Sequence, residues 1–152
     1  MATIVLKGHF VRKEQVGSAV ITPGHLVQVH ASDGAPRLRP HAAAGGNAQR
    51  AFALENDLVG GGIDDAYVAG ATVQYGVFAP GSEVYAWLAA GENAALGAAL
   101  ESAGDGTLQV HTPVNTDASD VDIPAAPIVA YAAEAVDNSG STQPVRIKVE
   151  VA

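Results

Sequence analysis

The stretch Thr-Val-Gln-Tyr-Gly-Val-Phe-Ala-Pro-Gly-Ser-Glu-Val-Tyr-Ala-Trp-Leu, residues 72–88, decides the fold. Thr72–Phe78 and Glu83–Leu88 each alternate with a period of two, which is typical of β-strands. Pro80 and Gly81 supply the backbone angles of a tight turn between them. The pattern predicts a β-hairpin whose strands carry large apolar groups on both faces. Such strands lie inside a barrel or sandwich, or against a second subunit.

The length of 152 residues suits one domain. Alanine accounts for 30 residues, while Val, Ile, Leu and Phe together number only 37, so we expect a thin core and extended segments that are buried on a partner. The 17 Gly and eight Pro favour short strands and turns over helices. We therefore predict an all-β protein. A compact β-barrel or β-sandwich covers residues 14–152, and an extended N-terminal arm covers residues 1–13.

The same reasoning predicts further strands along the chain. Ser18–Ile21 and His25–His30 flank the turn Thr22-Pro23-Gly24 and are expected to form a second hairpin. Other expected features are a turn at Asp33-Gly34 before the short strand Arg37–Arg39, a hairpin from Ala98–Ser102 to Thr107–His111, and strands at Ile128–Ala133 and Val145–Val151. In the last strand Val145, Ile147, Val149 and Val151 should face inward, with Arg146, Lys148 and Glu150 outward.

Charge is distributed unevenly along the chain. Residues 1–50 hold six Lys and Arg against two acids, a net charge of +4, whereas residues 51–145 hold thirteen acids and no base. An acidic body repels nucleic acid, so we expect no nucleic-acid partner, although the basic first third could bind an acidic protein surface. A merely solvated acidic surface explains the same imbalance equally well.

The sequence offers no pattern of residues for catalysis or for a cofactor. Cysteine is absent, which excludes disulfides, zinc–thiolate sites and thiol nucleophiles, and no Gly-x-Ser-x-Gly motif is present. His25 and His30 are an odd number of residues apart on an expected strand, so they cannot share a metal ion. No stretch approaches the length of a membrane span. We expect a protein that is not an enzyme, holds no cofactor and binds no membrane.

Two loops are weaker candidates for ligands. Three glycines, Gly60–Gly62, imitate a phosphate-binding loop, but the Gly-Lys-Ser/Thr ending is absent and acids follow. Asp117, Asp120 and Asp122 lie in a proline-rich segment and could hold a structural cation, although they lack the spacing and the closing Glu of a calcium loop. A plain solvated loop is the simpler interpretation of that segment.

Several stretches together resemble the head decoration, or capsid cement, proteins of tailed bacteriophages. The resemblance runs from about Pro23 to Val151 and rests on turn-and-strand patterns: residues 22–27 (Thr-Pro-Gly-His-Leu-Val), 62–67 (Gly-Ile-Asp-Asp-Ala-Tyr) with Ala69-Gly70, 79–86 (Ala-Pro-Gly-Ser-Glu-Val-Tyr-Ala), 101–108 (Glu-Ser-Ala-Gly-Asp-Gly-Thr-Leu) and the closing Val-rich strand.

The resemblance implies a β-rich virion protein, made in the host cytoplasm, that forms a homotrimer on the outer capsid surface. Proteins of this kind sit at or near three-fold positions and bridge subunits of the major capsid protein, and the resemblance carries over no catalytic residue. A rival interpretation is a carbohydrate- or receptor-binding β-sandwich module of a virion. Such a module should display clustered aromatic side chains, whereas the eight aromatic residues here are spread singly.

The N-terminal residues are the expected contact with the capsid or with a neighbouring subunit. Residues 1–13 combine basic and apolar side chains but have too little of either to fold alone. We therefore predict an arm that adds a strand to an exposed edge of a partner, and we expect its removal to leave the trimer intact. The predicted contact residues are Leu6, Lys7, Phe10, Arg12 and Lys13.

Overall fold

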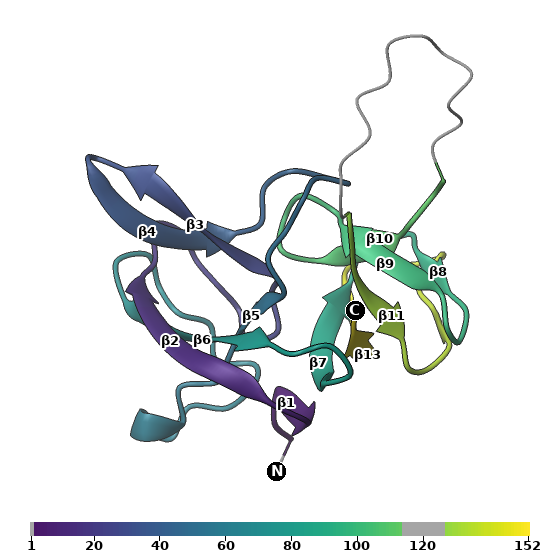
Figure 1. The fold of residues 1–152 in the computed structure, drawn as a ribbon, viewed down its shortest axis with the longest axis horizontal. Helices are drawn as coiled ribbons and strands as arrows, with labels where there is room; N and C mark the ends of the chain where they lie inside the picture. The colour runs from purple at the N-terminus through teal and green to yellow at the C-terminus, as the bar shows by residue number, and fades with distance from the viewer. Residues whose placement is uncertain (1, 114–126) are drawn as a thin grey trace, which may run out of the picture.

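The computed structural model describes residues 2–113 and 127–152, and these form an all-β protein (Figure 1). The strands are β1 (Val5–Lys7), β2 (Phe10–Val16), β3 (Val27–Ser32), β4 (Ala35–Pro40), β5 (Ala51–Ala53), β6 (Thr72–Phe78), β7 (Glu83–Leu88), β8 (Asn93–Ala94), β9 (Ala99–Ser102), β10 (Leu108–Val110), β11 (Ile128–Ala132), β12 (Val136–Asp137) and β13 (Val145–Val151). One 3₁₀ turn, η1 (Asp57–Val59), lies between β5 and β6. None of the helical segments in this described part could cross a membrane.

The second half of the chain forms a closed barrel, which we call the C-terminal barrel. Its strands follow the order β7-β10-β9-β11-β13, and β13 returns to pair with β7. On its other side β7 pairs with β1 along its first half and with β10 at its last residue. Closure therefore leaves β7 without a free edge. The barrel is filled by aliphatic side chains such as Leu88, Leu100 and Ile147, all fully buried. The expected all-β fold is therefore confirmed, and of the two expected architectures, barrel or sandwich, the second half of the chain forms a barrel.

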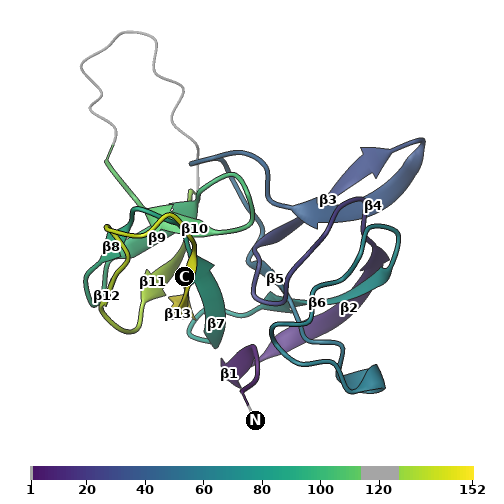
Figure 2. The same cartoon turned by 180° about the vertical axis from the view of Figure 1, so that it is seen from behind.

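The first half of the chain forms a more open unit, which we call the N-terminal lobe. It consists of the sheet β2-β6-β5 and the hairpin β3–β4. Single bridges link the hairpin to the sheet, Leu26 to Phe52 at one end and Gly17 to Leu38 at the other. The small core between them includes Ile21, Leu38, Val73 and Tyr75. Figures 1 and 2 show the lobe beside the barrel, with the free end of the β3–β4 hairpin pointing away from it.

The two strands of residues 72–88 have the predicted bounds, but they do not pair with each other. β6 pairs with β2 and β5, whereas β7 pairs with β1, β10 and β13. The turn at Pro80-Gly81, where Gly81 has a φ of 85°, carries the chain from the lobe into the barrel. The predicted hairpin is therefore wrong, since each strand finds longer ladders with distant partners. The N-terminal lobe buries the apolar groups of β6, and the C-terminal barrel buries those of β7.

The expected hairpin around residues 22–24 is also wrong in its pairing. The turn itself is present, with Gly24 at a φ of 92° and the His25 N–H donating to the Thr22 carbonyl at 3.0 Å. However, Ile21 bridges to Tyr67, while β3 pairs with β4 through a turn at Asp33 and Gly34. Both turn residues have positive φ, as two-residue hairpins require. The later hairpin β9–β10 pairs as predicted.

The segment expected to form a detached arm is part of the folded body. β1 pairs with β7, and all seven residues of β2 pair with β6. Ile4 is fully buried in the barrel core, and its N–H donates to the Glu55 carboxylate at 3.2 Å. The boundary at Lys13 therefore falls inside a strand, because the apolar groups of this segment find partners within the chain itself. That residues 14–152 form a single domain stays a prediction.

Candidate functional site

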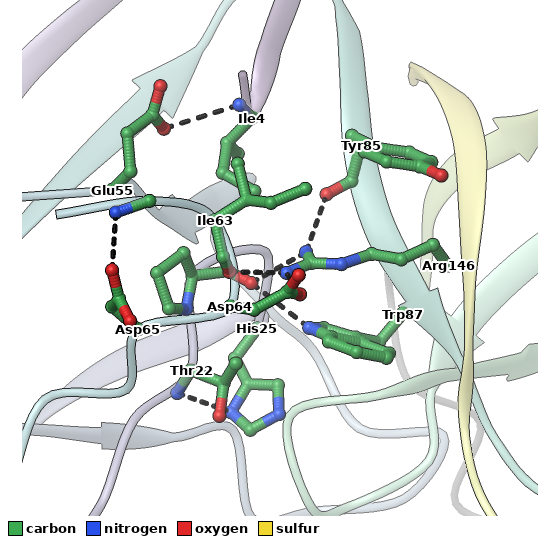
Figure 3. Close-up of polar contacts among 12 residues, drawn as sticks. Ile4, Thr22, His25, Glu55, Ile63, Asp64, Asp65, Tyr85, Trp87 and Arg146 are labelled. Atoms are coloured by element: carbon green, nitrogen blue, oxygen red, sulfur yellow. Dashed lines mark hydrogen bonds and ion pairs between the residues drawn. The ribbon is translucent and has the colours of Figure 1, made fainter. Parts of the chain in front are cut away.

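Arg146 is the centre of the polar contacts that join the barrel to the N-terminal lobe (Figure 3). It lies on β13, where alternation predicts an outward side chain, and it does point out of the barrel. Its guanidinium is nevertheless mostly buried, because it lies over the Trp87 ring, 4.0 Å from the ring centroid. This distance places the cation within range of a strong cation–π interaction.

The Arg146 guanidinium donates hydrogen bonds to three stretches that are distant in sequence. It reaches the carbonyl of Pro23 at 2.7 Å, the carbonyl of Tyr85 at 3.3 Å and the carbonyl of Ile63. Asp64, which is largely exposed, lies 3.2 Å away. Burial lowers the pKa of Arg146, and Asp64 opposes that shift. These partners belong to three of the sequence stretches that carry the resemblance to phage head proteins.

The junction leaves no room for larger residues. Trp87 also donates from its indole nitrogen to the Pro23 carbonyl, at 3.0 Å. A Cβ on Gly24 would lie 2.7 Å from the Tyr85 carbonyl oxygen, so only glycine fits both the space and the positive φ. Beside this turn, burial lowers the pKa of His25 to about 4; Asp105 opposes this shift and Arg146 adds to it. The junction is therefore a rigid structural contact.

A serine–histidine pair that the sequence did not reveal joins the last residue of β9, Ser102, to His41, which follows β4. The Ser102 hydroxyl is 2.7 Å from His41 Nδ1, and His41 Nε2 is 3.0 Å from the Asn47 carbonyl. Because a carbonyl only accepts, Nε2 carries the proton and the serine donates to Nδ1. A nucleophile and its base have this arrangement. Here Ser102 is fully buried and His41 is 4% exposed, so a substrate could not reach the hydroxyl. The pair therefore satisfies buried polar groups.

No group of three or more acids and histidines that could bind a metal ion exists among residues 2–113 and 127–152. Asp117, Asp120 and Asp122 lie outside the described residues, so a cation there stays a prediction. The Gly60–Gly62 loop lines a cleft of about 260 Å³ with Glu55 and Asp57. Two carboxylates beside this cleft would repel a phosphate.

The predicted contact residues do not form one surface. Leu6 and Phe10 are partly buried, and Phe10 stacks on Phe78 with ring centroids 5.1 Å apart. Lys7 pairs with Glu83 at 3.2 Å, which places it beside the barrel. Arg12 pairs with Asp57 at 3.3 Å, and Lys13 is exposed on the other face of β2. Phe10 and Arg12 share one face of β2, because they are two residues apart.

Most of the exposed large apolar side chains belong to the N-terminal lobe. Of the eight large apolar residues that the described structure exposes, six belong to residues 10–78 and only Leu96 and Tyr131 belong to the barrel half. The six are Val11, Val20, Val29, Leu58, Val59 and Val68. Only Leu58 and Val59 are adjacent in the sequence, and apolar side chains exposed singly are normal on a protein surface. The sequence alone could not identify them, because exposure depends on which neighbours cover each side chain.

Comparison with known proteins identifies a structural relative. No protein-family model matches the chain, and no curated protein sequence matches it. The structure is similar to the head fiber gp8.5 N base of bacteriophage phi29, with a TM-score of 0.59 over 95% of each chain and 12% sequence identity. The resemblance to phage head proteins in the sequence is thereby confirmed at the level of the fold. The chain has the all-β fold of a bacteriophage head protein.

Proposed function

We propose that this chain is a structural protein of a bacteriophage head, bound to the outer surface of the capsid. The observation that carries the proposal is the fold shared with a head fiber base over 95% of both chains. A match of that extent covers the lobe, the barrel and their junction together. It therefore supports a role for the whole chain, not for one common motif.

The proposed assembly is a homotrimer at or near three-fold positions that bridges subunits of the major capsid protein. The supporting observation is the uneven surface, because the N-terminal lobe exposes most of the large apolar groups while the barrel is closed. Many weak contacts repeated by symmetry give strong attachment without one strong site. β1 and β2 carry the proposed contact residues Leu6, Lys7, Phe10, Arg12 and Lys13.

The proposed role is structural and not enzymatic. It is supported by the burial of Ser102 and His41, because a substrate could not reach the Ser102 hydroxyl. A second serine–histidine contact in the described chain, Ser18 Oγ to His30 Nε2 at 2.7 Å, is exposed. A capsid-bound protein needs rigidity more than a reactive group. The Arg146 junction supplies rigidity by fixing the lobe to the barrel through hydrogen bonds to the Pro23 and Ile63 carbonyls.

A binding assay with capsid shells tests this function. Purified shells of the phage that encodes the chain, prepared without it, are mixed with the protein and sedimented. We expect saturable binding with a fixed number of copies per shell. An unrelated β-protein with a net charge of −8 serves as the control for charge. Failure to bind, or binding no stronger than that of the control, would contradict the proposed function.

A further inference from the structure

The β3–β4 hairpin carries basic side chains on one face. Its two strands pair with His30 opposite Arg37 and with Gln28 opposite Arg39. Leu38 lies between the two arginines and is fully buried in the core of the lobe, so alternation directs Arg37 and Arg39 to the opposite face of the hairpin. His30 shares that face, because it is the neighbour of Arg37 across the two strands. We call His30, Arg37 and Arg39 the basic face.

Ser18 fixes the position of His30 on this face. The Ser18 N–H donates to the Leu38 carbonyl at 2.8 Å, which places Ser18 along the outer edge of β4. The Ser18 hydroxyl lies 2.7 Å from Nε2 of His30, although His30 belongs to β3. The imidazole therefore extends across β4, the strand that carries both arginines. This contact holds the imidazole beside the two guanidinium groups.

The basic face lacks an acidic partner among residues 2–113 and 127–152. None of the ion pairs in this part of the chain includes Arg37 or Arg39. Arg37 donates to the carbonyl of Pro36, its neighbour in the chain, at 3.0 Å. Arg39 Nε is buried and has no hydrogen-bond acceptor there. A buried donor without an acceptor costs free energy, so an oxygen acceptor supplied by another molecule would stabilise Arg39.

The charge of this face identifies its ligand as an anion with oxygen acceptors. A guanidinium group binds a carboxylate through two parallel hydrogen bonds. Phosphate groups offer similar oxygens, but residues 51–145 contain thirteen acids and no Lys or Arg. Such a body repels nucleic acid, whose charges are closely spaced along its whole length. A protein with a local group of carboxylates can approach the hairpin, whose free end points away from the barrel (Figures 1 and 2).

We propose that the basic face docks on an acidic protein surface of the capsid shell and binds its side-chain carboxylates. The inference rests on the proposed function for the identity of the shell, whereas the preference for carboxylates follows from the unpaired arginines. The hairpin adds a second contact to the one proposed on β1 and β2. All three side chains of the basic face are partly exposed, so the contact should weaken as the salt concentration rises.

Nuclear magnetic resonance tests the carboxylate preference on the wild-type protein. Each arginine Nε–H gives its own signal in a proton–nitrogen correlation spectrum, and a short polyglutamate peptide is the probe. We expect the Arg39 signal to shift when the peptide is added, because its unpaired donor gains an acceptor. Arg146 Nε is also buried without an acceptor, but it lies in the junction, so its signal should stay unchanged and serves as the control. No shift at Arg39, or a larger shift with an oligothymidylate of equal charge, would overturn the proposal.

Sedimentation with capsid shells tests the docking partner. The double variant Arg37→Gln/Arg39→Gln removes both charges but keeps polar side chains. We expect it to bind shells about tenfold or more weakly than the wild type, since hydrogen bonds to charged groups are the strong ones. Lys148→Gln removes one charge from an exposed position on the barrel, so it should bind like the wild type. The changed residues lie outside the core, so circular dichroism and the melting temperature should match the wild type.

The outcomes separate this inference from the proposed function. If the wild type binds shells and the double variant binds as tightly, docking by the basic face is wrong while the proposed function stands. A wild type that does not bind shells overturns the proposed function, and the shell as the docking partner with it. A double variant that binds shells normally but loses self-association in sedimentation equilibrium shows that a second copy covers the basic face, which also overturns the shell as the partner. The magnetic resonance experiment needs no variant, so it decides the carboxylate preference even if the double variant misfolds.

Discussion

The C-terminal barrel and the N-terminal lobe differ in whether their strand edges are paired. In the barrel, β13 pairs with β7 along six residues and closes the ring of strands. In the lobe, among the residues that the structure describes, β2 forms a ladder only with β6 and β3 only with β4, and single bridges join the two parts. The barrel hides its backbone groups, while the lobe leaves edges and apolar side chains exposed.

This difference suggests that the barrel and the lobe have different roles. A closed barrel with a filled interior is a rigid scaffold and resists pairing with other strands. An open lobe leaves strand edges free, and a free strand edge can pair with another chain. Arg146 connects the two, so that a partner held by the lobe is also fixed to the barrel.

The largest effect is expected from removal of residues 1–13. The sequence led us to expect an intact trimer, whereas the structure predicts loss of folding, because Ile4 is fully buried and β2 forms the edge of the lobe sheet. Ile4→Ala alone should cost about 2–5 kcal/mol, a large part of a typical stability of roughly 5–15 kcal/mol. Circular dichroism and thermal melting measure this. A truncated protein that melts like the full chain would show that the lobe and barrel do not need these strands.

Removing the junction should have the next largest effect. Arg146→Ala leaves the Ile63 carbonyl without this donor and the Pro23 carbonyl with Trp87 alone, so we expect a loss of about 1.5–3 kcal/mol in the free energy of unfolding. Arg146→Lys should recover only part, because lysine lacks the planar group that stacks on Trp87. Trp87 is the sole tryptophan, so its fluorescence reports this contact during urea unfolding. A loss below about 1 kcal/mol would mean that the lobe and barrel hold together without Arg146.

The acid response of the junction is a smaller effect. The pKa of His25 is lowered from 6.5 to about 4, so the unfolded chain binds its proton first as pH falls. The stability that neutral, buried His25 contributes is therefore fully present above pH 6.5. It is lost as the pH falls from 6.5 to about 4, by roughly 3 kcal/mol at most. Urea unfolding at several pH values gives the free energy of unfolding of the wild type and of His25→Asn, and the difference between the two measures this contribution. Parallel curves for the two proteins would refute the assignment.

The smallest effect concerns the surface pair between β1 and the barrel. Lys7 and Glu83 are 3.2 Å apart, and the Lys7 side chain is 74% exposed. Water screens such a pair, so Lys7→Ala should change the free energy of unfolding by less than about 1 kcal/mol. If Lys7 contacts the capsid as proposed, binding to shells should weaken while stability is unchanged. Equal binding by the variant would remove Lys7 from the proposed contact.

Strand positions could be predicted from the sequence, but strand partners could not. The bounds of β6, β7 and β13 are those predicted from alternation, because a period of two reports a strand directly. Alternation does not say which strand lies alongside, so Pro80-Gly81 suggested a hairpin where the chain crosses between two sheets. The turn predicted at Asp33-Gly34 is present and joins β3 to β4, although the strand before it was expected to pair with Ser18–Ile21.

The junction could not be predicted for a related reason. Alternation places Arg146 on the outside of its strand, where a side chain is expected to face solvent. Its partner Pro23 is 123 residues away, so only the fold brings them together. One signal was present in the sequence, since Arg146 is the first base after residues 51–145, which contain none. The first base after so long an acidic stretch is a reasonable candidate for a structural cation.

Cryo-electron microscopy of shells with and without the protein tests the central claim most directly. The account predicts added density on the outer surface at or near three-fold positions, into which three copies fit with their N-terminal lobes in mutual contact and each spans neighbouring capsid subunits. Shells that look identical with and without the protein would contradict the account. Density confined to the interior or to the tail would do the same.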